Sequence, residues 1–275
     1  MFLKFNLIEI GIIMIIKSGK ELGKWLLVSS VFVMPAFLSQ SALADIKVRA
    51  GTSSVNYSAE MVLANKNFNR TADINGRLIG ITFIRESGLY LDVSMSAGQT
   101  AGKYPYLLGG APADTTFHTD IAWVVGKAYV DEESGLAKSI FIGYKTSRTE
   151  IDGPQVSNVP AAYKFNTSGL VVGGGISKPL EIGGSVGVNG GVGVMRMIWE
   201  ENYFAGTPTN ATSDLSYGYS LGASYTYPFS SAFGVALDYK TQSYNLKFST
   251  GTGPSLPTTI VEKVSALGLS LYGQF

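Results

Sequence analysis

Residues 215–227 read LSYGYSLGASYTY, and large and small side chains alternate along the whole stretch. Every odd position is apolar or aromatic, with Ala223 as the one small exception, and every even position is Gly, Ser or Thr. A repeat of two places these two sets on opposite faces of a β-strand. A soluble barrel turns its large apolar side chains inward, whereas a membrane barrel turns them outward to the lipid. The stretch therefore predicts a strand with lipid on one face and a polar lumen on the other.

The composition of the chain favours the same class of protein. Of the 275 residues, 45% are hydrophobic, 15% are charged and 33 are glycine. A soluble domain averages about 25% charged residues and roughly 7% glycine. Residues 45–275 carry 17 basic and 18 acidic side chains, so no basic bias points to nucleic acid. With no cysteine and one histidine there is no zinc-ligand set, and the sequence predicts neither a metal nor a cofactor.

The first 44 residues have the three parts of a secretory signal peptide. Lysines between 17 and 24 form a basic segment, residues 25–38 are mostly apolar, and residues 42–44 read Ala-Leu-Ala. A tripeptide of this kind is the usual cleavage site. The apolar segment is too short for a spanning helix, which needs about 20 residues. We therefore expect residues 1–44 to be a signal peptide and residues 45–275 to form the mature barrel domain.

The start of the chain leaves two alternatives open. A second apolar run, 8–16, precedes the basic segment, and Met14 would begin a signal peptide of ordinary layout. The true start is then Met14 rather than Met1, and residues 1–13 are a spurious extension. N-terminal sequencing of the precursor separates these alternatives.

Ten segments of the mature chain alternate in the same way as residues 215–227. A tilted membrane strand needs only about 9–11 residues, and after the signal no apolar run is long enough for a spanning helix. Membrane insertion is therefore expected through strands, and an even number of strands closes an antiparallel barrel without free edges. The expected strands are 45–55, 76–86, 89–98, 118–130, 137–148, 167–177, 185–194, 215–227, 233–242 and 261–275.

The connections between these segments alternate in length. Short periplasmic turns and longer outer loops are typical of outer-membrane barrels, and this order places both termini at the short-turn end. The expected fold is an all-β, ten-stranded antiparallel up-and-down transmembrane β-barrel. A soluble lipocalin-like barrel is the alternative, but its interior should be apolar. Short turns are expected near 86–88, 131–135, 177–183 and 228–231, and long loops near 56–75, 99–117, 149–166, 200–213 and 249–260.

The C-terminus, LGLSLYGQF, ends in an aromatic residue with apolar residues at alternate positions before it. This pattern resembles the assembly signal of bacterial outer-membrane proteins. The matching residues are Leu267, Leu269, Leu271 and Phe275, and Gly273 departs from the pattern. The resemblance implies export to the outer membrane of a Gram-negative cell, insertion by the barrel-assembly machinery, and contact with outer-membrane lipid and lipopolysaccharide.

The strand count and strand pattern are similar to those of several outer-membrane families. Ten strands is the count of the omptin proteases and of the OpcA-type adhesins. The general pattern also resembles the small OmpA-, OmpW- and opacity-like barrels. These resemblances identify the class of protein and no particular family, so they leave both surface proteins and enzymes open.

The inward polar side chains bear on whether the lumen conducts. Open aqueous channels belong to barrels of 16–18 strands, whereas eight strands are just filled by side chains. Ten strands lie near the closed end, and charges of both signs can pair across the lumen. A porin-like passage for small solutes stays as the alternative to a plug. Arg77 is expected to line the lumen near its outer end, together with Asp92, Lys145, Asn189, Arg196, Asp238, Lys240 and Gln242.

The single histidine, His118, precedes Asp120 by two residues. A His–carboxylate pair near the outer rim could activate a water or a serine, as in an omptin-like protease or a lipid A-modifying enzyme. Omptins also carry an Asp pair, but this chain has no Asp-x-Asp. We favour a polar rim residue, because one histidine without a convincing partner set is a weak catalytic signal.

Aromatic residues near the expected strand ends predict an interfacial girdle. Trp199, Tyr225 and Tyr227 belong to this set, and a sugar-binding stack is the alternative. The outer loops are rich in Asn, Thr, Pro and Gly, which suits exposed segments. The sequence therefore favours a small, non-enzymatic surface or structural barrel with exposed loops, or a narrow small-solute channel. The competing hypothesis is an outer-membrane hydrolase that uses His118.

Overall fold

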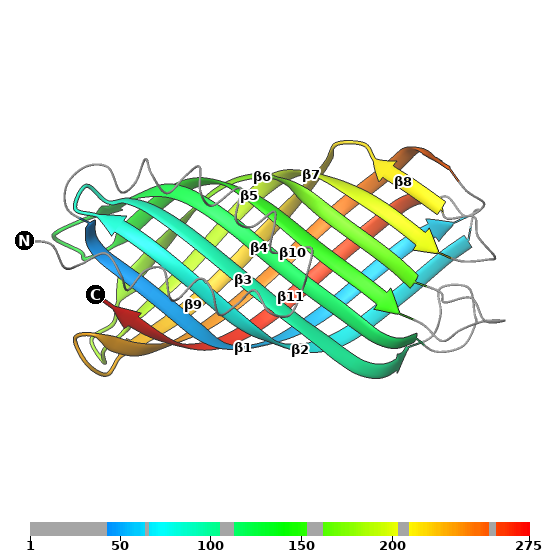
Figure 1. Cartoon of the computed structure of the whole chain (residues 1–275). Coiled ribbons are helices and arrows are strands. Elements are labelled where there is room, and N and C mark those ends of the chain that lie inside the picture. Colours follow the sequence, from blue (N-terminus) through cyan, green and yellow to red (C-terminus); the bar gives the residue numbers. More distant parts are fainter. Residues whose placement is uncertain (1–42, 64–65, 105–112, 153–161, 203–208, 253–256) are drawn as a thin grey trace, which may run out of the picture. The chain divides into compact units, whose positions relative to one another are not determined.

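The strands of the chain close into one antiparallel barrel (Figure 1). The computed structural model describes residues 43–63, 66–104, 113–152, 162–202, 209–252 and 257–275. Its strands are β1 (Leu43–Leu63), β2 (Lys66–Arg85), β3 (Leu89–Tyr104), β4 (Ala113–Val130), β5 (Ala137–Asp152), β6 (Ala162–Pro179), β7 (Ser185–Asn202), β8 (Thr209–Ser213), β9 (Ser216–Pro228), β10 (Phe233–Thr252) and β11 (Pro257–Gln274). They occupy ten positions, because β8 and β9 follow one another between β7 and β10.

Pairing between β1 and β11 closes the barrel. Ile46 and Phe275 exchange two backbone hydrogen bonds, of 2.9 and 3.0 Å, where the two strands end. Each position of the barrel is therefore paired on both sides, which lipid demands because unpaired backbone groups are costly there. The expected ten-stranded antiparallel barrel is confirmed. Within the described ranges no helix is long and apolar enough to cross a membrane.

The expected signal peptide lies almost entirely outside the described residues. The structure describes nothing before Leu43, so neither the extension 1–13 nor a start at Met14 is tested.

Strand β9 shows the alternation that the sequence predicts. Tyr217, Tyr219 and Leu221 face outward and are 78%, 53% and 55% exposed. The small residues of the opposite face leave room for larger neighbours. A Cβ built on Gly218 would lie 2.1 Å from the ring of Tyr244 on β10, so that ring occupies the space.

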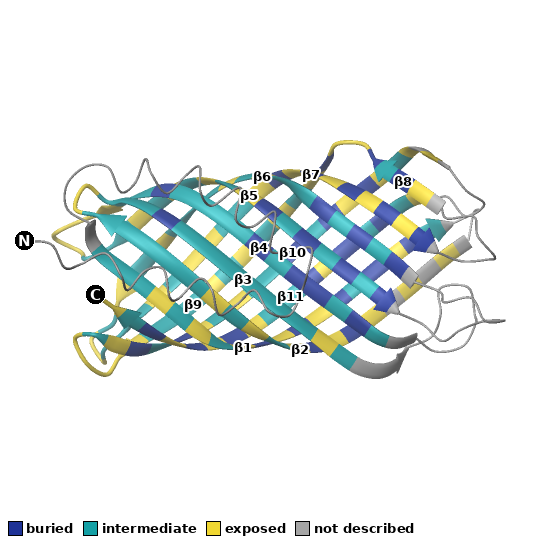
Figure 2. Cartoon of the chain, viewed as in Figure 1, coloured by how far each residue is buried: buried dark blue, intermediate teal, exposed yellow. Residues whose placement is uncertain are grey.

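The longer strands reverse the polarity of their faces part of the way along, whereas β9 does not. On β10 the outward residues Phe233 and Leu237 are apolar, whereas the outward Asn245 further along is polar. The inward face changes in the opposite sense, from Asp238 to the fully buried Leu246. Figure 2 shows that buried residues gather in the half of the barrel that carries β8. This half is built like a soluble barrel, with an apolar interior and a polar outside.

The apolar outer surface divides the barrel into two parts. The parts of the strands with apolar outward side chains are the membrane-spanning segments, and the rest of the barrel, toward β8, is called the outer extension. A strand needs about 9–11 residues to cross, but β1 has 21 and β10 has 20. The outward apolar side chains that define the membrane-spanning segments lie within 46–50, 79–85, 89–95, 121–130, 137–144, 170–179, 185–194, 216–228, 233–239 and 267–274.

The expected long loops are wrong over most of their length, because the outer extension is strand. Residues 56–63 and 66–75 pair with each other as the outer parts of β1 and β2. The alternation continues there, but it no longer matches a lipid-facing pattern, so the expected strands end too early. The other four long connections shorten in the same way, leaving 105–112, 153–161, 203–208 and 253–256 outside the described residues.

The bore of the outer extension is filled by a packed apolar core. The indole of Trp199 meets the ring of Phe165 edge to face, with centroids 4.9 Å apart, and Trp199, Tyr57 and Leu246 have no exposed surface. The core draws residues from β1, β2, β5, β6, β7, β8, β10 and β11. The placement of Trp199 in an interfacial girdle is therefore wrong, since its side chain points into the barrel.

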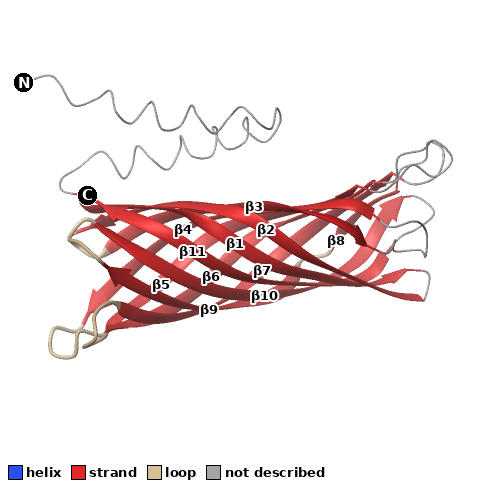
Figure 3. Cartoon of the chain, turned by 90° about the horizontal axis from the view of Figure 1, so that it is seen from below, coloured by secondary structure: helices blue, strands red, loops and turns tan. Residues whose placement is uncertain are grey.

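The tight turns gather at the other end of the barrel, where the described C-terminus also lies (Figure 3). Gly88 and Gly135 have φ angles of 80° and 65°, which favour glycine. In the second turn Asp131 Oδ1 accepts hydrogen bonds from the backbone of Glu133 and Ser134, at 3.1 and 3.3 Å. These bonds hold the pKa of the Asp131 carboxyl below its usual value. The turns lie where the sequence predicts them.

Candidate functional site

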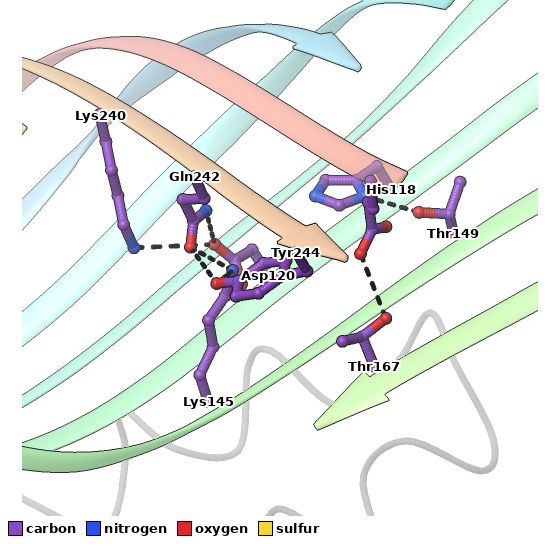
Figure 4. Close-up of polar contacts among 9 residues, drawn as sticks. His118, Asp120, Lys145, Thr149, Thr167, Lys240, Gln242 and Tyr244 are labelled. Carbon is purple, nitrogen blue, oxygen red and sulfur yellow. Dashed lines mark hydrogen bonds and ion pairs between the residues drawn. The ribbon is translucent and has the colours of Figure 1, made fainter. Parts of the chain in front are cut away.

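A cluster of polar side chains crosses the lumen where the membrane-spanning segments meet the outer extension (Figure 4). The lumenal cluster consists of Asp120, Lys145, Lys240, Gln242 and Tyr244. They come from β4, β5 and β10, and β4 lies five positions from β10 in the ten-position barrel. The contacts of Asp120 and Lys145 with β10 therefore join opposite walls, whereas the contact between Asp120 and Lys145 joins the neighbouring strands β4 and β5.

Lys145 is the centre of this cluster. Its ammonium lies 3.0 Å from Asp120 Oδ1 and donates hydrogen bonds to Gln242 Oε1 and, at 3.2 Å, to the hydroxyl of Tyr244. An ammonium has three protons to donate, so all three have partners here. Lys145 is 3% exposed, and burial of a charge is costly unless it is paired in this way.

The remaining contacts tie β10 to Asp120 on the far wall. Gln242 Nε2 donates to Asp120 Oδ2 at 3.3 Å, and Lys240 Nζ lies 3.9 Å from the same oxygen. The hydroxyl of Tyr244 donates to Gln242 Oε1 at 2.8 Å. Two lysines and one aspartate leave one positive charge, which is spread over a fully connected network. The cluster closes the bore with bonds and does not line an open path.

His118 is enclosed rather than exposed at the rim. Its ring is 3% exposed, Nδ1 lies 2.9 Å from the Thr149 hydroxyl, and the ring of Tyr57 is 5.6 Å away. It lies in the outer extension, two residues beyond Asp120 on the same inward face. Burial is the main cause that lowers the pKa of His118 to about 4, so the ring is neutral near pH 7. The rim position that the sequence suggests is therefore wrong.

The expected pairing of His118 with Asp120 is replaced by two separate contacts. Asp120 binds Lys145 and Gln242, and the described hydrogen bond of His118 goes to Thr149. A general base needs hydrogen-bond reach to a substrate proton, and the buried ring offers no such approach. The geometry of these two residues is that of a structural network.

Two buried acids of the outer extension escape sequence reasoning. Glu262 is 1% exposed and accepts a hydrogen bond of 3.2 Å from Thr167, and burial raises the pKa of its carboxyl. Glu201 is 2% exposed, and burial raises its pKa to about 7, although Trp199 and Tyr163 lower it in part. Glu201, like Tyr244, would have been found by continuing the inward alternation past the expected strand end, and Glu262 by following it within the expected strand 261–275.

Near the tight turns the lumen is more open and more polar than in the outer extension. Arg49 pairs with Asp92 at 2.8 Å, and Thr82 donates to the same carboxylate at 2.6 Å. Asn189, which also faces inward, helps to line a cavity of about 250 Å³ with Tyr90, Ser139 and Ser224. Asp92, Asn189 and Asp238 thus lie on the expected face, whereas Arg49 was missed.

Two arginines expected in the lumen face outward instead. Met195 and Met197 have no exposed surface and point into the core, so Arg196 between them is exposed on the outside of β7. Arg77 is exposed on the outside of β2 in the same way, beside the inward Leu78. The prediction is wrong because it assumed a polar interior up to the outer end, where the interior is apolar.

The C-terminal pattern residues lie on the lipid-facing surface. Leu267, Leu269, Leu271 and Phe275 are 49%, 54%, 65% and 71% exposed, and Tyr272 between them points inward at 8%. Alternation along β11 accounts for this split.

Known structures resemble this chain in fold, but the comparisons identify no family for it. No family model and no curated protein matches the sequence. The translocator domain of the autotransporter NalP from Neisseria meningitidis is 10% identical, with a TM-score of 0.48 over 91% of this chain and 95% of that one. Neisserial surface protein A is 10% identical, with a TM-score of 0.39 over 84% and 97%. The toluene transporter TodX of Pseudomonas putida is 10% identical, with a TM-score of 0.35 over 85% and 90%.

The fold class is that of the outer-membrane β-barrels, to which these proteins belong. For this chain it rests on the closed ten-position sheet and on the apolar outer surface of its membrane-spanning segments. TM-scores below 0.5 carry no argument about anything finer.

Proposed function

We propose that the protein is a closed outer-membrane barrel that holds a rigid outer extension and its connecting loops above the membrane surface. The apolar core that fills the bore of the outer extension is the observation that carries this proposal. Large side chains with 0–1% exposure occupy the path that a solute would take. A polar solute would have to displace them and leave its own hydration shell, which is costly in an apolar medium.

The lumenal cluster is a second observation that supports a closed lumen. Just below the core, Lys145 pairs with Asp120 on the neighbouring strand and binds Gln242 and Tyr244 across the bore. A conducting lumen needs polar groups to which a solute can bind and from which it can dissociate. The polar groups of the lumenal cluster instead bind one another. The proposed role is therefore a surface or structural one, and not the passage of small solutes.

Planar-bilayer recording of the refolded protein tests this proposal. The wild-type protein should give no stepwise conductance, and the double variant Phe165→Ala/Trp199→Ala should give small, frequent steps because its core is opened. Regular steps from the wild-type protein would overturn the proposal. Heat-dependent gel mobility shows whether each preparation is folded.

The proposed role is non-enzymatic, and the surroundings of His118 support this. Its ring is buried, bonded to Thr149, and separated from the outside by the core. His118→Asn should therefore leave peptide cleavage and lipid A modification unchanged in cells that express the protein. Loss of either activity in this variant, with folding retained, would favour the hydrolase.

The proposed partners during biogenesis are the barrel-assembly machinery and, afterwards, outer-membrane lipid and lipopolysaccharide. Exposure of Leu271 and Phe275 on the terminal strand leaves the C-terminal pattern open to recognition. Phe275→Ala should reduce the amount of folded protein in the outer membrane several-fold, while the same change at Phe229, in a turn, should not. An equal effect of both changes would contradict this role.

A further inference from the structure

The lipid-facing wall made by β6, β7 and β9 contains a shallow apolar groove. Gly190 faces outward on β7 beside Gly174 of β6, so two adjacent outward positions carry no side chain. The groove measures about 690 Å³, which falls within the range of small-molecule sites. Its lining combines the outward side chains of Val172, Val192, Tyr219 and Leu221 with residues of the inward rows, namely Phe141, Gly173, Gly191 and Ser220.

An exposed arginine stands on the same wall, above this groove. Arg196 lies six residues beyond Gly190 on β7, or about 20 Å along the strand, and the outward residues between them are Val192 and Val194. Its register partner on β6 is Ser168, one outward position beyond the last apolar residue, Leu170. Arg196 thus lies near the end of the apolar outer surface, with one more exposed apolar residue, Ile198, beyond it on β7.

The guanidinium of Arg196 has no protein partner among the described residues. Arg148 on β5, which also faces outward in this region, is paired with Glu150. For Arg196 no ion pair or hydrogen bond is present in the described part of the chain, and Ile198 separates it from Glu200 along the outward face. An arginine fork of this kind matches a phosphate group with two parallel hydrogen bonds.

We propose that this wall binds one phosphorylated lipid, with an acyl chain in the groove at Gly190 and a phosphate on Arg196. The two parts of the site match the two parts of such a molecule, and they lie one above the other on the same strand. Arg196 is at the end of the membrane-spanning segments away from the tight turns. Given the proposed outer-membrane placement, on which this step rests, that end faces outside, and the lipid is a phosphorylated glycolipid of the outer leaflet.

Arg77 provides a matched control on the opposite wall. It is also exposed, and it lies one outward position beyond Ile79 on β2, five barrel positions from β7. Below it, Ile79, Ile81 and Phe83 occupy the outward positions, and Phe83 stands six residues from Arg77, where β7 has Gly190. Arg77 therefore has the charge and the level of Arg196 without the groove.

Native mass spectrometry of the refolded protein in detergent tests the site. Diphosphorylated lipid A is the probe, with dephosphorylated lipid A and phosphatidylglycerol as comparisons. Arg196→Gln should weaken binding of the diphosphorylated lipid about tenfold, as expected for loss of a charge-assisted contact. Gly190→Leu should also weaken it. A Cβ at Gly190 would lie 3.3 Å from Leu221 in otherwise open space, so the new side chain fills the groove and spares the wall.

The control variant and the comparison lipids decide the result. Arg77→Gln should change the affinity by less than about twofold, since no groove lies below it. Equal weakening by the two arginine variants, or equal binding of the dephosphorylated lipid, would overturn the site. Phosphatidylglycerol binding with the same affinity and the same dependence on Arg196 would overturn its assignment to a glycolipid. Bilayer conductance of the same preparation tests the closed lumen separately.

Discussion

Lys145 shows what a charged side chain needs inside a narrow barrel. Its ammonium is nearly inaccessible to water, forms an ion pair with Asp120 on β4, and donates hydrogen bonds to Gln242 and Tyr244 on β10. Its position was predictable, because Lys145 follows the outward Tyr144 in a regular alternation. The partners of Lys145 were not predictable, because the alternation along β5 does not show which residues of the neighbouring β4 and of β10, across the bore, its ammonium contacts.

Removal of the Lys145 charge should destabilise the barrel strongly. Lys145→Met leaves Asp120 buried without its main partner, and loss of one member of a buried pair costs about 3–5 kcal/mol. Denaturant unfolding in detergent measures this change. Lys263→Met breaks the pair with Glu60, in which both side chains are 52% exposed, and should cost less than about 1 kcal/mol. Equal effects of the two variants would contradict the buried network.

Glu201 should make the stability of the outer extension depend on pH. Burial raises its folded-state pKa to about 7, so the neutral acid is the form that the folded protein prefers. The stabilisation is fully present below the ordinary glutamate pKa of about 4.3 and is lost as pH rises through 7. Thermal unfolding at pH 4 and pH 8 measures it.

The matched variants for this pH dependence are neighbours on β7. Glu201→Gln should reduce the loss of stability between pH 4 and pH 8, whereas Glu200→Gln, at an exposed position, should leave it unchanged. The same pH dependence in Glu201→Gln and in the wild-type protein would show that Glu201 is not its source.

At the scale of the element, the longer strands reverse the polarity of their faces and β9 does not. This difference explains why the sequence predicts the bounds of β9 well and ends other strands too early. Residues 215–227 lie within the lipid for their whole length, so a single pattern predicts strand β9 well. Strand β1 leaves the lipid after residue 50 and continues to Leu63 with polar side chains outside. A search for apolar outward faces therefore ends early there and assigns the remainder to a loop.

The hairpin formed by residues 56–63 and 66–75 tests this difference. If it is strand, as in the structure, the backbone amides of 56–63 should be protected from hydrogen exchange for hours, because these residues pair with β11 on one side and with 66–73 on the other. Exchange measured in detergent by mass spectrometry reports this directly. Complete exchange of these peptides within seconds would show the loop that the sequence suggests.

In the whole molecule, the reversed polarity of the longer strands gathers apolar side chains inside the outer extension. Each strand that contributes to the core of the outer extension places buried apolar side chains in the bore, and β7 and β11 add the buried acids Glu201 and Glu262. Nearer the tight turns the interior keeps a small polar cavity. In the proposed closed barrel, the lumen therefore opens toward the turns and ends at the core of the outer extension.

The absence of cysteine from the whole chain makes this closed lumen directly measurable. A single cysteine in place of Ser224, in the polar cavity, can be labelled in whole cells with a membrane-impermeant maleimide. The same change at Asp214, exposed on the outer extension, is the control for outside access. We expect labelling of Asp214→Cys in intact cells, and labelling of Ser224→Cys only after the periplasm is opened. Labelling of Ser224→Cys from outside in intact cells would contradict the closed lumen.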